Sequence, residues 1–201
     1  MLISLLKVSI VVCTFSKERE RQVLGCLESL TQQTLKPHEI ILVVDPDPDL
    51  KESYSSQVPS NVTIVTAKET GLSNARNAGL LAAGGEVVAF IDDDATADVN
   101  WLRNLEGNFR DDNTLGVGGY VRPVWENGRP TWFAEELDWV VGCSYRGGPR
   151  EKCYVRNPFG CNMAFRTTVF REIGAFRPGI GRIGKVLIGS EAQTSTPGSI
   201  E

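Results

Sequence analysis

The amino-acid sequence predicts an α/β protein with a mostly parallel, Rossmann-like sheet and helices on both faces. Over roughly residues 1–95, short apolar runs alternate with helical patterns in the order βαβαβαβ. This alternation implies parallel strands that are joined by right-handed crossovers. The chain has 201 residues, of which 41% are hydrophobic, so it can bury a core without disulfides or a structural metal. We therefore expect one domain.

The start of this pattern contains three strands and one amphipathic helix. The strands are expected at Val8–Cys13, Glu39–Asp45 and Asn61–Thr66. The second strand is apolar nearly throughout and should be buried on both faces. The helix is expected at Glu18–Gln33, because its apolar residues recur with helical spacing: Val23, Cys26, Leu27 and Leu30. Between the second and third strands, Pro46–Asp49 should form a loop.

The next helix, in "GLSNARNAGLLAAG", has one face of mostly small residues and should lie close against the sheet. That face comprises Leu72, Ala75, Gly79 and Ala82. Ser73 is expected to cap the start of this helix, and Gly84 and Gly85 should end it. The fourth strand is expected at Val87–Ile91, and three aspartates follow it directly.

Polar residues follow the carboxyl ends of these strands, which is where ligands bind in open α/β sheets. Thr14 and Phe15 follow the first strand, Asp45 ends the second, and Asp92–Asp94 end the fourth. Three carboxylates this close repel one another by roughly 4 kcal/mol per close pair at an effective dielectric of about 20. Solvent, protonation or a bound divalent cation can offset this repulsion. The residues alone do not decide among solvent, protonation and a cation.

The residue types at this edge suit a divalent cation and a phosphorylated ligand. In extended backbone, Asp92 and Asp94 face the same side, and carboxylates suit Mg²⁺ or Mn²⁺, which also bind substrate phosphates. Arg76 and Asn77 lie in the first turns of the second helix, where both can contact the same phosphates. Asp45 can accept a hydrogen bond from a nucleobase.

Several other functions are disfavoured. Dinucleotide binding needs a glycine-rich turn after the first strand, but "CTFSKERERQ" has no glycine, and the first is Gly25. A net charge of −4 without a basic run argues against nucleic acid as a partner. The five cysteines form no CxxC pair, so zinc is not expected, and Cys13 and Cys26 are expected in a core. A reducing, cytoplasmic location follows. Leu2–Leu6 should extend the first strand, with peripheral membrane contact as the alternative.

Four segments together resemble the successive motifs of family 2 glycosyltransferases with the GT-A fold: "VSIVVCTFSKERE", "EIILVVD", "GLSNARNAGLLAAGGEVVAFIDDDA" and "GCNMAFRTTVF". The resemblance covers roughly residues 7–191. It implies metal-dependent, inverting transfer of a sugar from a nucleotide-diphosphate donor, usually UDP-linked, to a glycan or lipid-linked acceptor. It also implies a nucleotide-binding half at 1–95, an acceptor and sugar half at 96–191, and a disordered or non-native tail at 192–201.

The resemblance assigns roles to the residues at the sheet edge. It implies that Thr14 and Phe15 lie beside the nucleoside, Asp45 at the base, and Arg76 near the base and phosphates. It places Asp92–Asp94 as the D-x-D-type element.

Within that triplet, Asp92 would support the bend, Asp93 would lie near the ribose or sugar, and Asp94 would hold the metal. The resemblance thus favours Asp94 as the first metal ligand over Asp92 and Asp94 as twin ligands, because side chains need not keep alternating where a strand ends. In "NPFGCNMAFR", Gly160 would allow close approach of the donor sugar, and the amide of Asn162 would contact sugar hydroxyls.

The end of the resemblance departs from the family pattern. An acidic pair normally supplies the catalytic base, but here Glu191 is followed by Ala192. Either Glu191 is the base, or the chain is a truncated, catalytically impaired protein that binds sugar nucleotides. We expect the second. A sugar nucleotidyltransferase is a weaker alternative, because "TFSKERE" lacks the glycine-rich loop that would hold a triphosphate.

The acceptor is expected to bind the second half of the chain. Trp125, Trp132 and Phe133 lie near prolines and glycines, which makes them candidates for an acceptor-facing or lipid-facing surface. The segment "PTWFAEELDWVVGCSYRG" is similar to family members that act on polyprenyl- or dolichyl-linked sugars, with glucuronosyl transfer as one possibility.

Overall fold

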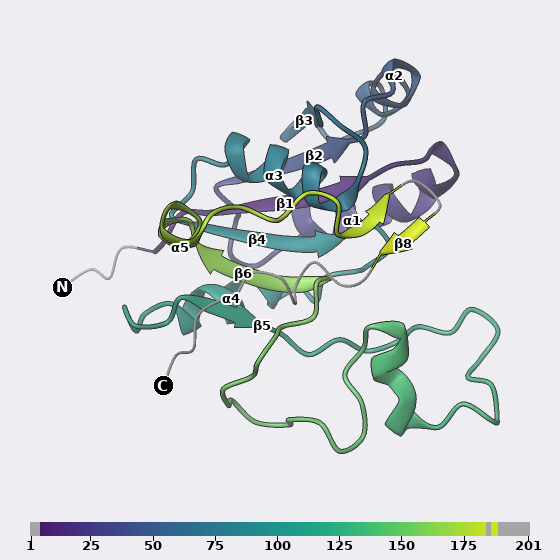
Figure 1. Cartoon of the computed structure of the whole chain (residues 1–201), viewed down its shortest axis with the longest axis vertical. Coiled ribbons are helices and arrows are strands. Elements are labelled where there is room, and N and C mark those ends of the chain that lie inside the picture. Colours follow the sequence, from purple (N-terminus) through teal and green to yellow (C-terminus); the bar gives the residue numbers. More distant parts are fainter. Residues whose placement is uncertain (1–4, 184–185, 189–201) are drawn as a thin grey trace.

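A computed structural model describes residues 5–183 and 186–188 of the chain (Figure 1). Strands from both halves of the sequence form one six-stranded sheet in the order β3-β2-β1-β4-β6-β5. The first four in sequence are mutually parallel, whereas β6 runs antiparallel to both β4 and β5. The strands are β1 (Val8–Thr14), β2 (Glu39–Val44), β3 (Val62–Thr66), β4 (Val87–Asp92), β5 (Gly116–Gly118) and β6 (Asn162–Arg166).

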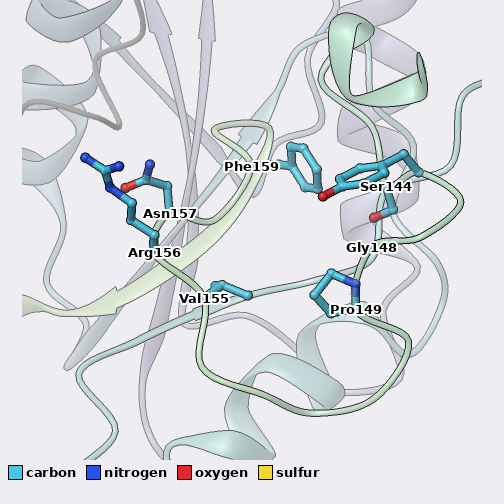
Figure 2. Close-up of a pocket in the computed structure, with 8 residues that line it drawn as sticks. Ser144, Gly148, Pro149, Val155, Arg156, Asn157 and Phe159 are labelled. Atoms are coloured by element: carbon cyan, nitrogen blue, oxygen red, sulfur yellow. The ribbon is translucent and has the colours of Figure 1, made fainter. Parts of the chain in front are cut away.

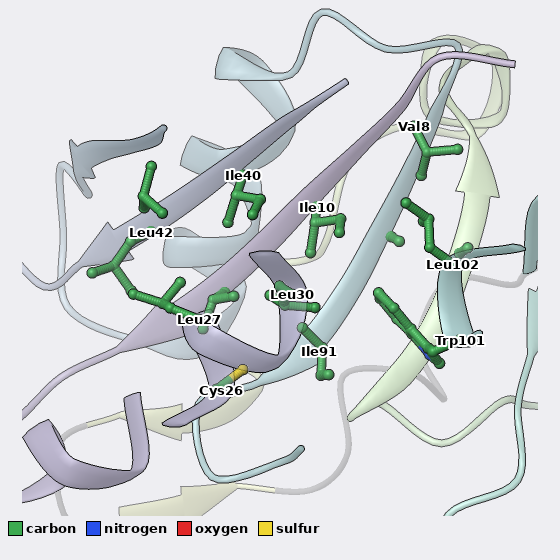
Figure 3. Packing of buried hydrophobic residues seen from close by; sticks show 14 of the residues in the cluster. Val8, Ile10, Cys26, Leu27, Leu30, Ile40, Leu42, Ile91, Trp101 and Leu102 are labelled. Atoms are coloured by element: carbon green, nitrogen blue, oxygen red, sulfur yellow. The ribbon is translucent and has the colours of Figure 1, made fainter. Parts of the chain in front are cut away.

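Helices cover both faces of this sheet, as the sequence predicts. Alternate residues of the central strands enter two separate apolar cores, because successive side chains of a strand point to opposite faces. Ile10 packs with α1 (Glu20–Thr31), α2 (Pro48–Ser55) and α4 (Trp101–Asn108) on one face. Val11 packs with α3 (Leu72–Ala82) and α5 (Thr167–Ile173) on the other. Figure 3 shows the first core, with Leu27 and Leu30 of α1 lying over Ile10, Ile40 and Leu42.

The helix α3 lies directly on the sheet, and its small face explains why. A Cβ atom at Gly79 would clash with Val11 and would lie 3.1 Å from Val43. The predicted cap is wrong: Gly71, with φ of 124°, precedes the helix, and Ser73 lies inside it, where its hydroxyl donates to the Ile180 carbonyl at 2.9 Å.

The helix α2 is absent from the sequence prediction, which treats Pro46–Asp49 as a loop. Asp47 caps this helix by accepting hydrogen bonds from the backbone amides of Asp49 (2.9 Å) and Leu50 (3.3 Å). Pro48 occupies the first turn, where its missing N–H costs nothing. Leu50 and Tyr54, four residues apart, are buried against the core. The prediction missed the capping pattern of an acidic residue before proline.

A long excursion, residues 119–161, separates β5 from β6 and extends away from the sheet (Figure 1). It contains one 3₁₀ helix, η2 (Glu135–Val141). The Arg129 guanidinium lies 5.2 Å from the Trp125 ring and makes two 2.7 Å contacts with the buried Asp138 carboxylate. These hydrogen bonds lower the pKa of Asp138.

The backbone of a two-stranded sheet follows α5, with β7 (Gly181–Ile183) antiparallel to β8 (Val186–Ile188). None of the helices in the described part of the chain combines the length and apolar character that a bilayer crossing needs.

Candidate functional site

The carboxyl ends of the parallel strands and the amino end of β6 meet at one edge of the sheet, which we call the rim. Cys13 of β1 is in register with Asp92 of β4, and Ile91 is in register with Asn162 of β6. The Asp45 amide donates to the Thr14 carbonyl at 3.1 Å. The predicted convergence of polar residues at one edge is therefore present, and the antiparallel β6 adds Asn162 to it.

The triplet Asp92–Asp94 divides into three environments. Strand β4 ends at Asp92 and a turn follows, so the strand alternation that would pair Asp92 with Asp94 stops there. The Asp92 carboxylate turns toward Arg76, at 3.3 Å. The Asp93 side chain is only 6% exposed, whereas that of Asp94 is 56% exposed. Repulsion within the triplet is thus offset by two arginines on opposite sides.

The first of these arginines, Arg76, is buried behind the rim. Its Nη2 atom donates to Asp92 and to the Gly160 carbonyl at 3.0 Å, and its guanidinium lies 5.7 Å from the Phe176 ring. Because Arg76 is only 3% exposed, it fixes Asp92 and the Gly160 backbone from behind. The predicted place of Arg76 near the base and phosphates of a donor stays a prediction.

The second arginine, Arg19, comes from the 3₁₀ turn η1 (Lys17–Arg19) after β1 and is a site residue that the sequence prediction missed. It donates to Asp93 from Nε (2.8 Å) and Nη2 (2.7 Å), and Nη2 also contacts Asp94 at 2.7 Å. These bonds raise the pKa of Arg19. Its guanidinium lies 5.4 Å from the ring of Phe15, which is half-buried.

Asn162 holds the two ends of the excursion together. Its Oδ1 atom accepts from the Trp101 indole N–H at 2.9 Å, and its Nδ2 atom donates to the Tyr120 carbonyl at 3.2 Å. A side chain at Gly119 would clash with this amide. Asn162 therefore joins α4, the start of the excursion and β6.

Asn77 is held by the backbone of Phe176, and its predicted phosphate contact stays a prediction. Its Nδ2 atom donates to the Phe176 carbonyl at 2.7 Å, and its Oδ1 atom accepts from the Phe176 amide at 2.9 Å. Because both ends of the amide are engaged by the same backbone, Asn77 anchors the segment that brings Phe176 onto Arg76. Glu191, the predicted base, lies outside the described residues.

Burial also shapes the remaining polar groups behind the rim. Thr14 is 2% exposed, so it lies beneath the surface that Phe15 reaches. The pKa of Cys13 is raised to about 12, chiefly by burial, while the Arg76 charge lowers it and the nearby Asp92 and Asp93 charges raise it. Cys13 is thus a neutral thiol that packs behind the site, as the sequence predicts for a core residue.

The carboxylates of the rim fit a divalent cation that is shared with a ligand. Asp94 is exposed and Asp92 is 40% exposed, and both supply the oxygen ligands that Mg²⁺ and Mn²⁺ prefer. Among the described residues, no group of three His, Cys, Asp or Glu side chains is placed to hold a metal. A cation here would therefore take the rest of its ligands from water and phosphate, as Mg²⁺ usually does.

A pocket of about 330 Å³ lies within the second half of the excursion, between residues 144–149 and 155–159 (Figure 2). Its walls include Pro149, Val155 and Phe159, and Figure 2 shows Arg156 and Asn157 on the stretch that leads to Phe159. Phe159 directly precedes Gly160, whose carbonyl contacts Arg76. A residue of the pocket wall and a residue that contacts Arg76 are therefore adjacent in the sequence.

Comparison with known proteins gives one family model that matches most of the chain. The model is described as glycosyl transferase family 2 and matches residues 9–174. Among curated relatives, the glucosyl-dolichyl phosphate glucuronosyltransferase of Haloferax volcanii is 37% identical over 183 residues, covering 89% of this chain and 58% of the relative. A putative glycosyltransferase of Bacillus subtilis, EpsH, is 28% identical and covers 72% of this chain and 40% of the relative. The chain thus spans about half the length of these relatives.

Solved structures share the fold at low sequence identity. A mannosyltransferase from Pyrobaculum calidifontis, in complex with GDP-Man and Mn²⁺, has a TM-score of 0.64 and 19% identity over 89% of this chain and 49% of that protein. TarS of S. aureus, residues 1–349 with UDP-GlcNAc, has a TM-score of 0.62 and 20% identity over 94% of this chain and 52% of that protein. The predicted GT-A fold is confirmed.

Proposed function

The chain belongs to glycosyl transferase family 2, and from that premise we propose that it transfers a sugar from a nucleotide-diphosphate donor to a lipid-linked or glycan acceptor, with inversion at the anomeric carbon. The observation that carries this proposal is the arrangement of Asp92–Asp94 between Arg19 and Arg76 at the carboxyl ends of the strands. We propose a UDP-linked donor, which the similarity to a UDP-GlcNAc-binding protein supports. GDP is the first rival, because another similar structure contains GDP-Man.

The rim supplies what donor cleavage needs. Loss of a nucleoside diphosphate builds negative charge on the leaving phosphate, and fixed positive groups stabilise that charge more in the transition state than in the ground state. Arg76 is held by Asp92 and Gly160, so it contributes its charge without reorganising. In this proposal Phe15 lies beside the nucleoside, Asp45 accepts a hydrogen bond from the base, and Thr14 shapes the floor.

The metal of this proposal is Mg²⁺ or Mn²⁺ at Asp94. When bound, such a cation would neutralise charge on the leaving diphosphate. Asp94 would hold it from the exposed side of the triplet, while Asp92 stays oriented by Arg76 and Asp93 by Arg19. The Mn²⁺ in the similar mannosyltransferase structure supports this assignment.

We place the acceptor in the pocket beside Phe159. Aromatic and apolar walls suit the C–H face of a sugar, and Arg156 and Asn157 offer donors to a phosphate and to hydroxyls. The excursion also exposes large apolar side chains, including Trp132 (77% exposed) and Trp139 (57% exposed). Such a surface suits contact with a lipid, whereas Trp125 and Phe133 pack against each other, with ring centroids 5.3 Å apart. A dolichyl-type lipid acceptor, as named for the Haloferax relative, fits both features.

The base that deprotonates the acceptor is proposed to be Glu191. A second candidate function, binding of the sugar nucleotide with poor transfer, is favoured by Ala192, which stands where family members carry a second carboxylate. Single-turnover transfer with the unmodified chain and with Glu191→Gln distinguishes the two. Transfer that is abolished by the substitution supports Glu191 as base, and transfer absent from both proteins supports the second candidate.

The donor class is tested by nucleotide-dependent stabilisation of the folded chain. A ligand that binds only the folded state adds about 2.7 kcal/mol of stability at a concentration of 100 Kd. UDP, GDP, dTDP and CMP are each added with Mn²⁺, with Mg²⁺ or without metal, and the melting temperature is measured. We expect metal-dependent stabilisation by UDP that is lost in Asp94→Asn. The control Glu52→Gln makes the same charge change on an exposed position of α2 and should retain the effect. No response to any nucleotide would contradict the proposed function.

A further inference from the structure

One guanidinium bridges the two carboxylates at the front of the rim. Arg19 binds Asp93 through Nε and Nη2, and the same Nη2 atom binds Oδ2 of Asp94. The Asp93 side chain is almost fully buried, whereas that of Asp94 is mostly exposed. The bond to Asp94 is therefore the outer one, where a competing cation can reach the carboxylate.

The two bonds differ in what their loss would cost. A buried carboxylate that loses its partner is strongly destabilised, so Arg19 should stay on Asp93. The contact with Asp94 is a single, partly exposed bond, and exposed ion pairs contribute little. A ligand at the rim can thus exchange this second bond without disturbing the first.

We propose that Arg19 makes metal binding at Asp94 depend on the nucleotide. This inference rests on the proposed function. Without a donor, Arg19 pairs with Asp94 and repels a cation that approaches the same carboxylate. When a nucleotide diphosphate arrives with the cation, Nη2 of Arg19 donates to a phosphate oxygen, and Asp94 is released to the metal. Arginine suits this exchange, because its planar fork binds carboxylate and phosphate in the same geometry.

Among the described residues, no group of three His, Cys, Asp or Glu is placed for a metal, so water and phosphate oxygens would complete the coordination of a cation at Asp94. A nucleotide diphosphate supplies the phosphate oxygens. The exchange at Arg19 is a second reason for the metal ion and the nucleotide diphosphate to bind together. Because its guanidinium also lies over Phe15, where the nucleoside is proposed to bind, donor binding and release of Asp94 occur side by side.

The test measures Mn²⁺ affinity by calorimetry or by the electron paramagnetic resonance of free Mn²⁺, with and without UDP or GDP. It compares the unmodified chain, Arg19→Gln and the control Arg21→Gln, which makes the same charge change at an exposed position of α1. We expect Arg19→Gln to bind Mn²⁺ alone about tenfold more tightly, with a smaller further gain from nucleotide. The control should match the unmodified chain. Equal Mn²⁺ affinity of Arg19→Gln and the unmodified chain, without nucleotide, would overturn the inference.

A paired variant guards against misfolding of Arg19→Gln. Arg19→Gln with Asp93→Asn replaces the buried ion pair by two amides and keeps Asp94 intact. Circular dichroism checks that it is folded, and a smaller gain in Mn²⁺ affinity is expected, because Asp94 is released from Arg19 while the negative charge of Asp93 is also lost. Failure of this folded variant to gain affinity would also refute the role of Arg19. By contrast, if no nucleotide strengthens Mn²⁺ binding in any protein, the proposed donor site fails, while the nucleotide-free comparison still decides the role of Arg19 toward the metal.

Discussion

Gly79 lies at the closest approach of α3 to the sheet, and we predict that Gly79→Ala destabilises the fold and weakens the site. The added Cβ would clash with one methyl of Val11 and lie 3.0 Å from the other and 3.1 Å from Val43. Both valines are at most 1% exposed, so neither can move aside. Overpacking costs about 1–3 kcal/mol, against a gain of roughly 1 kcal/mol in helix propensity. The net loss of stability is therefore up to about 2 kcal/mol, which would lower Tm by up to about 8 °C.

Urea unfolding followed by circular dichroism measures this loss, and Gly25→Ala is the matched control. Gly25 lies inside α1, and a Cβ there would meet no atom within 4 Å, so this variant should gain about 0.5–1 kcal/mol. Arg76 lies one turn before Gly79 on α3, so Gly79→Ala should also weaken Mn²⁺–UDP binding while Gly25→Ala leaves it unchanged. If both variants changed stability equally, close packing of α3 would not be what fixes this helix.

Three further predictions concern the rim and the excursion. Arg76→Gln should lower the rate of sugar transfer at least about 100-fold and should also lower Tm, because Asp92 and the Gly160 carbonyl lose a charged donor. Steady-state kinetics measure the rate and calorimetry measures Tm. An unchanged rate would exclude the electrostatic role of Arg76. Arg129 lowers the pKa of Asp138 below its ordinary 3.8. The ion pair therefore stabilises the fold above pH 3.8, and this stabilisation is lost as the pH falls through the lowered pKa of Asp138. Asp138→Asn should reduce Tm at pH 7 and show a smaller drop in Tm on acidification. Iodoacetamide at pH 8 should modify the exposed Cys153 well before the partly buried Cys13, whose pKa is raised to about 12. Mass spectrometry of peptides checks the order, and equal rates would contradict the raised pKa of Cys13.

The parallel strands and α1 follow from sequence because their signals are local. Residues Val8–Thr14 are apolar almost throughout and are paired on both sides, as a buried parallel strand requires. The helix α2 is short, and its only apolar anchors are Leu50 and Tyr54, so proline and aspartate suggested a loop. Ser73 failed as a cap because Gly71 already supplies the turn and the Ser73 hydroxyl finds a carbonyl 107 residues away.

Side-chain partners in the site were predictable only where strand order determines them. Asp92 and Asn162 lie at the same edge because β4 and β6 are neighbours and Ile91 is in register with Asn162, and the family motifs already point to both. Arg19 contacts Asp93 across 74 positions of sequence, and nothing in "SKERER" distinguishes it from Arg21, which lies two residues further on and is exposed. Asn77 looked like a phosphate ligand at a helix start, yet the backbone of Phe176 takes both ends of its amide.

The charges of the rim explain why three consecutive aspartates can end a buried strand. Each carboxylate has a guanidinium beside it, with Arg76 on Asp92 and Arg19 on both Asp93 and Asp94. Because Arg19 alone pairs with both Asp93 and Asp94 in the described contacts, these two carboxylates keep an excess of negative charge, and Asp94 is the more exposed of the two. A cation alone would satisfy that excess but would face Arg19, and a diphosphate alone would face the aspartates. The two together bring compensating charges to both partners, so we expect the triplet to favour a metal–diphosphate pair over either component.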